Sequence, residues 1–359
     1  MKPWLGPLLS VFLLIGVGIA IYLSMQEQLL EGATVTVRGL IGSEKEEFFK
    51  DPRVIEVLQN HGLDVKIEKA GSREIATSFD LGQYDFAFPA GVPAAEKIRR
   101  EQGIHKFYAP FFTPMAIASW KTVAEVLAAN GIAEERKGYY TLNMAFLLKE
   151  IAEGRRWKDL ADNPNYAVNK SILISSTDIR KSNSAAMYLA LASFVANGNN
   201  VVQSDADITR VRPLMENLFL RQGFVEYSSE APFEDYLVMG MGKAPLVMVY
   251  ESQFVQRSVA EDGGIMPEML LIYPKPTIFT KHILLPLSEA GKKLGEALET
   301  DPELQSLAIE YGFRNNNIQY FREHTRKYGV PVADNLVDVI EPPSYEVIEH
   351  MIELIDQRY

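Results

Sequence analysis

Polar side chains crowd the start of one helix that the sequence predicts. The stretch SSTDIRKSNSAAMYLALASF, residues 175–194, follows a short apolar strand over residues 171–174 and leads into an apolar helix. The first N–H groups of a helix have no partner inside the helix, so Ser182, Asn183 or Ser184 could cap it. One cap would be enough. The remaining hydroxyl and amide groups favour a second interpretation, a site for an anion or a carbonyl group at this N-terminus.

Other predicted helix starts carry residues of the same kind. Ser43 follows one glycine, and Ser72 and Arg73 follow another. Each hydroxyl could cap its helix or bind a ligand, and the guanidinium could neutralise an anion or remain solvated. Gly91 lacks a Cβ, so the backbone could approach a ligand closely there; an ordinary turn is the alternative.

Tyr250 and Glu251 stand at the end of a further apolar strand, PLVMVY. A carboxylate in this position more often pairs with an arginine than binds a ligand. If Glu251 faces a binding site, it favours a ligand with a hydrogen-bond donor, a positive group or a coordinated cation. Arg180 and Lys181 could serve an anion, or they could simply be solvated.

The sequence contains no recognisable catalytic machinery. It has no cysteine, which excludes a cysteine nucleophile, disulfides and thiolate metal sites. Its five histidines are scattered, and neither an HExxH pair nor a GxSxG or Walker A motif occurs. GMGKAP, residues 240–245, lacks the spacing and the Ser or Thr of a phosphate loop. We therefore expect no enzyme, no metal and no cofactor.

Charge and hydropathy limit which partners the protein can bind and indicate the compartment in which it lies. A net charge of −11 over 359 residues argues against a nucleic-acid partner, which would need a basic face. Residues 3–26 carry no charge and are long enough to span a bilayer. Lys2 precedes this segment and Glu27 follows it, so the positive-inside rule places the rest of the chain outside the cytoplasm. We expect an uncleaved single-pass anchor over residues 1–26; a cleaved signal peptide and a buried helix are the alternatives.

Strand and helix patterns alternate from residue 34 onward, which predicts a mostly parallel sheet. One helix is expected over residues 43–62, with Ser43 and Glu46 as a capping box, and another over residues 139–153. Two strand-rich segments punctuated by prolines, near residues 106–120 and 269–287, read as two passages between α/β lobes. The predicted domains are residues 32–113 plus 275–315, residues 114–274, and a C-terminal helical extension over residues 316–359.

Three segments resemble the extracellular solute-binding proteins of bacteria that have the type II periplasmic-binding fold. LLIYPKPTIFTKHILLPL followed by helices and an ending with Gln305, Ala308, Gly312, Phe313 and Arg314 is similar to that family's closing section. ISSTDIRKSNSAAMYLALA and APLVMVYESQF resemble segments of its second lobe. The resemblance covers residues 34–315 as an order of elements. It implies two lobes that close on a solute by hinge motion.

The resemblance implies capture of a small ligand, an inorganic oxyanion such as molybdate or sulfate being the first expectation, for an ABC permease. The alternative is a sensor or scaffold module of an envelope complex. The chain departs from the family in its anchor-like N-terminus, its acidic first helix start and its C-terminal extension. In the extension, apolar residues at helical spacing over residues 347–355 predict a helix that packs on a lobe, or one that docks on a membrane partner.

Overall fold

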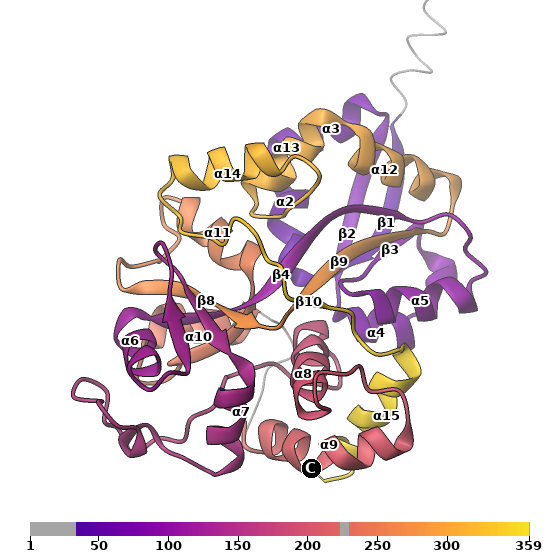
Figure 1. Cartoon of the computed structure of the whole chain (residues 1–359). Helices are drawn as coiled ribbons and strands as arrows, with labels where there is room; N and C mark the ends of the chain where they lie inside the picture. The colour runs from indigo at the N-terminus through magenta and orange to yellow at the C-terminus, as the bar shows by residue number, and fades with distance from the viewer. Residues whose placement is uncertain (1–33, 223–229, 359) are drawn as a thin grey trace, which may run out of the picture.

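The computed structural model describes residues 34–222 and 230–358, and strands and helices alternate through the first part as the sequence predicts (Figure 1). β1 (Val35–Ile41) lies between β2 (Leu63–Lys69) and β3 (Phe86–Phe88), and both neighbours run parallel to it. The helices of this part are η1 Ser43–Lys45, α2 Glu46–Lys50, α3 Pro52–Asn60, α4 Ser72–Thr77, η2 Leu81–Gln83 and α5 Val92–Glu101.

Two long strands carry the chain between the two halves of the molecule. β4 (Tyr108–Trp120) pairs with β9 (Thr277–Pro286) through its first part and with β7 (Leu246–Tyr250) and β8 (Met269–Lys275) through its second. The strand order β2-β1-β3-β9-β4-β8-β6-β5 is therefore continuous through both halves. We call the half around β1, β2 and β3 lobe 1, and the half around β7 and β8 lobe 2.

Lobe 2 completes the sheet with β5 (Ala133–Glu135) and β6 (Tyr140–Asn143), the latter parallel to β8. Its helices are α6 Lys121–Ala129, α7 Met144–Ala152, η3 Trp157–Asp159, α8 Asn183–Ala196, α9 Asp205–Leu220, α10 Glu230–Met239 and α11 Glu251–Val259. The first eleven residues of α8 are all buried, which explains why the sequence of this helix is apolar on every side.

Separate apolar cores support the two lobes. In lobe 1, Val37 and Ile41 pack on one face of the sheet with α2 and α3, while Leu40 packs on the other face with α4 and α5. This follows from the alternation of side chains along a strand. The core of lobe 2 is built around α8 and the buried strand β7.

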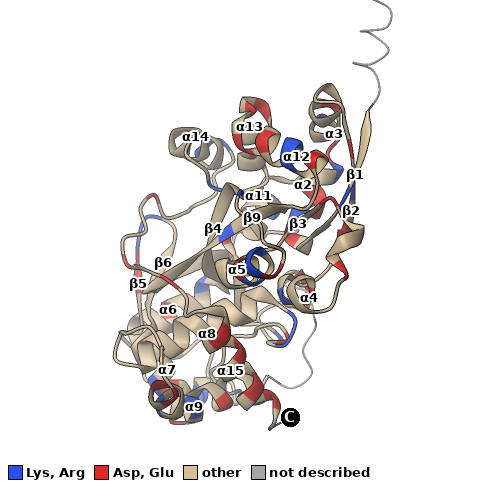
Figure 2. Ribbon diagram, turned by 90° about the vertical axis from the view of Figure 1, so that its right-hand side faces the viewer, with Lys and Arg blue, Asp and Glu red and all other residues tan. Residues whose placement is uncertain are grey.

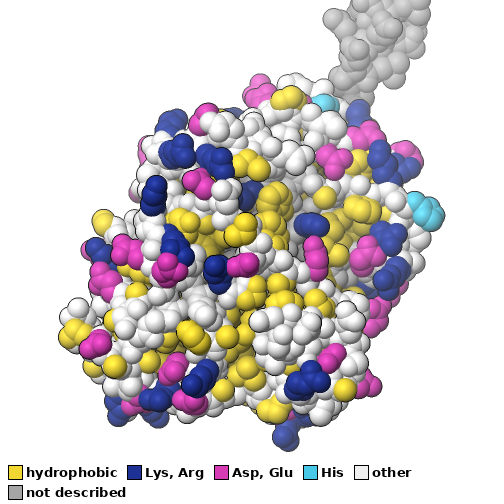
Figure 3. Space-filling model, viewed as in Figure 1, with side chains coloured by type: hydrophobic (Ala, Val, Ile, Leu, Met, Phe, Trp, Pro, Cys, Tyr) yellow, Lys and Arg dark blue, Asp and Glu magenta, His cyan; other side chains and the backbone are white. Residues whose placement is uncertain are grey.

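On the surface, charged side chains of both signs are dispersed over the face shown in Figure 3, and hydrophobic side chains gather between the two halves.

The C-terminal part passes both lobes. α12 (Glu289–Thr300) and α13 (Pro302–Glu310) belong to lobe 1, and α14 (Ile318–Lys327) packs on α13. β10 (Val339–Ile340) then pairs with β9 between the lobes, and α15 (Tyr345–Asp356) packs on α9 (Figure 1). The predicted C-terminal helix therefore forms, and its apolar residues face the protein.

Five predictions about the elements are wrong. The sheet is not mostly parallel, because β4 pairs in antiparallel fashion with β7, β8 and β9. The helix expected over residues 43–62 is divided at Asp51, because the residue before Pro52 is driven out of the helical region and its carboxylate caps α3 instead. Ser43 is not at an N-cap position, because it is the first residue of η1, and the N-caps of η1 and α2 are Gly42 and Lys45. The stretch 139–153 is a strand followed by α7, and residues 171–174 form only an isolated bridge rather than a regular strand.

The expected anchor, residues 1–26, lies outside the described residues. Among residues 34–222 and 230–358, the structure contains no helix with the length and apolar character that a bilayer crossing requires. The boundaries proposed for the lobes and for the extension remain predictions.

Candidate functional site

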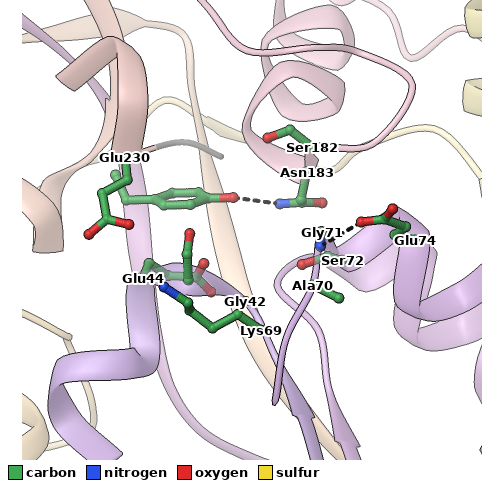
Figure 4. A pocket seen from close by; sticks show the side chains of 12 residues that line it. Gly42, Glu44, Lys69, Ala70, Gly71, Ser72, Glu74, Ser182, Asn183 and Glu230 are labelled. Carbon is green, nitrogen blue, oxygen red and sulfur yellow. Dashed lines mark hydrogen bonds between the residues drawn. The ribbon is translucent and has the colours of Figure 1, made fainter. Parts of the chain in front are cut away.

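A cavity of about 250 Å³ lies where the two lobes meet (Figure 4). Lobe 1 contributes the starts of η1 and α4, and lobe 2 contributes the start of α8, the end of β7 and the start of α10. The lining residues are Gly42, Ser43, Glu44, Lys69, Ala70, Gly71, Ser72, Glu74, Ser182, Asn183, Glu230 and Tyr250. Segments far apart in the sequence thus meet at one place, as expected for the carboxyl ends of strands in open α/β sheets.

At this cavity the starts of η1 and α8 lack a side-chain cap, whereas at the start of α4 the Glu74 carboxylate accepts from the Gly71 N–H at 3.3 Å. η1, α4 and α8 begin after Gly42, Gly71 and Ser182, and none of these residues makes a side-chain cap hydrogen bond. By contrast, Ser204 caps α9 and Ser288 caps α12, both outside the cavity lining. The capping interpretation of Ser182 is therefore wrong. The positive end of the α8 dipole remains directed at the cavity from lobe 2.

Ser182, Asn183 and Ser184 form a buried polar group at the start of α8. The Ser182 and Ser184 hydroxyls are 2.9 Å apart, and Ser184 is also 2.9 Å from the hydroxyl of Thr177. Asn183 Nδ2 donates to Tyr250 Oη at 3.0 Å (Figure 4). Ser182, Asn183 and Tyr250 line the cavity, whereas Ser184 lies behind it and holds the neighbouring hydroxyls in place.

In lobe 1, the predicted ligand-binding residues Ser43 and Ser72 line the cavity. The Ser72 hydroxyl accepts a hydrogen bond from the Ala90 N–H at 2.8 Å, so it also fixes the next loop. Gly91 has a φ of 89°, and a Cβ there would lie 2.2 Å from Asn183 Oδ1. Glycine is thus required at residue 91 by close approach of the other lobe, and the residue itself is not in the cavity lining.

Two predicted site residues have protein partners instead of a place in the lining. Arg73 donates to Glu349 Oε2 at 2.8 Å and to the carbonyl oxygen of Arg180 at 3.0 Å. Glu251 accepts from Arg314 at 2.6 and 2.7 Å and from the Tyr273 hydroxyl. The alternative in which Glu251 pairs with an arginine is therefore correct.

A buried charged cluster that reaches the cavity lining through Glu44 was not predicted. Lys45 Nζ bonds the Glu44 carboxylate and lies 3.1 Å from His282 Nδ1. Burial raises the pKa of the Glu44 carboxyl, but Lys45 and His282 outweigh this and lower it overall. Burial and the Lys45 ammonium lower the pKa of His282 to about 4. Glu44 is therefore an anion at neutral pH, and His282 is neutral.

The charged residues of the lining are mainly acidic. Glu44, Glu74 and Glu230 line the cavity with one cation, Lys69, which is 2.5 Å from Glu46. The sequence pattern singled out helix caps, and the glutamates immediately after Ser43 and near Ser72 were missed. The sequence feature that pointed to a glutamate in the lining was the acidic composition of the segment after Gly42. Within the part of the chain that the structure describes, no group of three His, Asp or Glu side chains could hold a metal ion.

The strand order, the two crossings and the cavity between lobes define a mixed α/β fold of the kind found in periplasmic solute-binding proteins. The chain is similar to the sulfate-binding protein SubI from Mycobacterium tuberculosis, with 14% identity, a TM-score of 0.53, and coverage of 90% of this chain and 99% of that chain.

Two further solved structures are similar at the same level. The apo ferric ion-binding protein A of Pasteurella haemolytica has 12% identity and a TM-score of 0.54. The periplasmic binding protein AfuA of Actinobacillus pleuropneumoniae, bound to fructose-6-phosphate, has 13% identity and a TM-score of 0.54. Each comparison covers 90% of this chain and 97% of the other. No protein-family model matches the chain, and no curated protein matches it. At these identities the likeness defines the fold alone.

Proposed function

We propose that the protein captures a small polar solute between its two lobes on the extracytoplasmic side of a membrane. The observation that carries this proposal is the cavity lined from both lobes by helix starts, hydroxyls and an amide, with the starts of η1 and α8 free of side-chain caps. Such groups hold a solute by hydrogen bonds, and a cavity between lobes closes around it by hinge motion. Three solved binding proteins of the same fold support this reading.

The side chains of the lining favour a solute that donates hydrogen bonds or carries positive charge. Glu44 is ionised, and Glu74 and Glu230 add negative charge, so a dianion would be repelled. The basic residues near the helix starts are engaged by carboxylates: Arg73 by Glu349, and Lys181 by Glu74 at 3.6 Å. These pairs count against the oxyanion that the sequence first suggested, although the helix N-termini favour one.

We further propose that residues 1–26 tether the protein to the membrane and that an ABC permease receives the solute. The tether rests on the apolar, uncharged sequence of residues 3–26, and the permease rests on the resemblance of the fold. No catalytic step is proposed.

Tyr250→Phe tests the site, because it removes one hydroxyl from the lining and keeps the ring. Tyr236→Phe is a matched control, since Tyr236 is also buried and its hydroxyl donates to the Ser119 carbonyl at 2.6 Å within lobe 2. Thermal-shift titration of the full chain would use a panel of amines, amino acids, sugars and oxyanions. We expect one class to stabilise the wild type, with affinity lost about tenfold in Tyr250→Phe and kept in Tyr236→Phe.

A panel without any stabilising compound, and native mass spectrometry without a bound small mass, would contradict solute capture. The second candidate function is then the sensor or scaffold module. One observation favours it specifically: the C-terminal extension contacts both lobes, which a protein that must open and close freely would not need.

A further inference from the structure

α15 is fixed to lobe 2 by its apolar face. Ile348, Met351, Ile352 and Ile355 are each at most 3% exposed, and they belong to the same apolar core as α8 and α9. None of the α15 side chains joins the lobe 1 core around α4 and α5. The free energy of burial therefore attaches this helix to lobe 2.

The polar edge of α15 contacts lobe 1 through ion pairs, and Figure 2 shows the acidic residues along this helix. Glu349 binds the Arg73 guanidinium through two hydrogen bonds, and these side chains are 20% and 9% exposed. Arg100 also donates to Glu346 at 2.9 Å, but this pair is exposed and contributes little. The partly buried bidentate pair is thus a strong contact between α15 and lobe 1. α15 also packs on α5, where the Lys97 ammonium lies 5.5 Å from the centre of the Tyr345 ring.

Arg73 also joins the two lobes directly. Its Nε donates to the carbonyl oxygen of Arg180 at 3.0 Å, in the turn that precedes α8. Beside it, a Cβ on Gly71 would lie 2.4 Å from the carbonyl oxygen of Lys181. Gly71, Ser72 and Glu74 line the cavity, so these contacts close one side of the proposed solute site.

The connection that leads to α15 restricts its position. β10 pairs with Thr277 and Ile278 of β9 where the chain crosses between lobes. Only residues 341–344 separate β10 from α15, and Pro342 and Pro343 fix the backbone within this connection. The N-terminal end of α15 is thus held close to β9, where the chain crosses between the lobes. The helix lies on the side of the cavity where Arg73 of lobe 1 contacts Arg180 of lobe 2.

From this arrangement we infer that α15 is a strap that holds the lobes closed in the absence of solute. Opening of the cavity requires the Arg73–Glu349 pair to break while the apolar face of α15 stays on lobe 2. The strap regulates access to the proposed solute site, and to that extent the inference rests on the proposed function. Closure by the strap itself is independent of any solute and can be measured alone.

The experiment measures the distance between the lobes in protein without solute. Because the chain has no cysteine, Lys66→Cys in lobe 1 and Lys149→Cys in lobe 2 give unique spin-label sites, and both side chains are more than 60% exposed. Dialysed full-length protein, shown by native mass spectrometry to hold no small mass, is examined by double electron–electron resonance. Glu349→Gln together with Glu346→Gln weakens the strap on lobe 1.

Glu353→Gln is the matched control, because Glu353 is on the same helix, is exposed and forms no ion pair with the described residues. We expect one short distance in the wild-type background and in Glu353→Gln. In the double variant we expect a second, longer distance, with the open fraction increased about tenfold. An equally open wild type, or a double variant that stays entirely closed, would overturn the inference. Neither result would depend on whether a solute binds.

Discussion

Glu251 lies between the lobes rather than in the cavity, where its carboxylate is completely buried against the guanidinium of Arg314. Arg314 also donates to the Ala333 carbonyl at 2.7 Å and lies over the Phe321 ring, so the pair connects α11 to the C-terminal extension. Glu251 therefore contributes to the packing of the protein through its pair with Arg314.

Glu251→Gln should lower the free energy of unfolding by about 3–5 kcal/mol, because it leaves the buried Arg314 cation without its counter-charge. Replacing both residues by methionine should cost less than the sum of the two single replacements. Urea unfolding measures both effects. Glu134→Gln, which disrupts an exposed pair with Arg136, should change stability by less than about 1 kcal/mol. Strict additivity of the two methionine replacements would argue against a coupled buried pair.

His282 gives the protein a defined pH dependence. Its pKa is lowered from 6.5 to about 4, so between these values the unfolded chain binds a proton that the folded chain does not. The free energy of unfolding should therefore be fully retained above pH 6.5 and should fall as the pH is lowered toward 4, by about 3 kcal/mol over this window.

His282→Gln should remove this part of the slope, and the exposed His105→Gln should keep it. Urea unfolding at several pH values provides the comparison. The same slope in wild type and His282→Gln would show that other groups determine the acid sensitivity.

At the scale of elements, α15 supplies a large part of the apolar cover of lobe 2. Four of its side chains, Ile348, Met351, Ile352 and Ile355, are almost fully buried, and their burial contributes on the order of 6–12 kcal/mol as an upper estimate. This is comparable with the whole stability of a typical domain.

Deletion of residues 345–359 should therefore strongly reduce soluble yield and lower the melting temperature. Deletion of residues 357–359 alone removes none of the four buried side chains and should have little effect. A truncated chain that melts at the wild-type temperature would contradict the assigned packing of α15 on α9.

At the scale of the whole molecule, lobe 1 and lobe 2 meet so closely that single glycines decide the fit. Gly71→Ala would direct a methyl group at the Lys181 carbonyl across the interface, and no unusual φ at residue 71 adds strain. The substitution should separate the lobes and increase the radius of gyration in small-angle scattering. Gly242→Ala, where a Cβ meets nothing within 4 Å, should leave the scattering curve unchanged. Identical curves for both variants would mean that the interface adjusts without opening.

The sequence by itself determined the α/β alternation, the two crossing strands and the hydroxyl-bearing helix starts. These features are local, since hydrophobic periodicity and turn residues act over a few neighbours. Pro52 could likewise have indicated the break between α2 and α3. For the same reason Ser43, Ser72, Ser182, Asn183 and Tyr250 all line the cavity, because each ends a strand or begins a helix at the carboxyl edge of the sheet. Their role in ligand binding stays a prediction.

Only the tertiary structure decided which charges face the cavity. Arg73 and Glu251 have suitable positions in the sequence for a ligand site. In the structure, however, Arg73 pairs with Glu349 and Glu251 pairs with Arg314, each more than 60 residues away. Glu44 gains its importance from Lys45 and from His282, 237 residues beyond Lys45. Pairing of buried charges depends on which segments meet in space, and burial strengthens it. No local pattern contains that information.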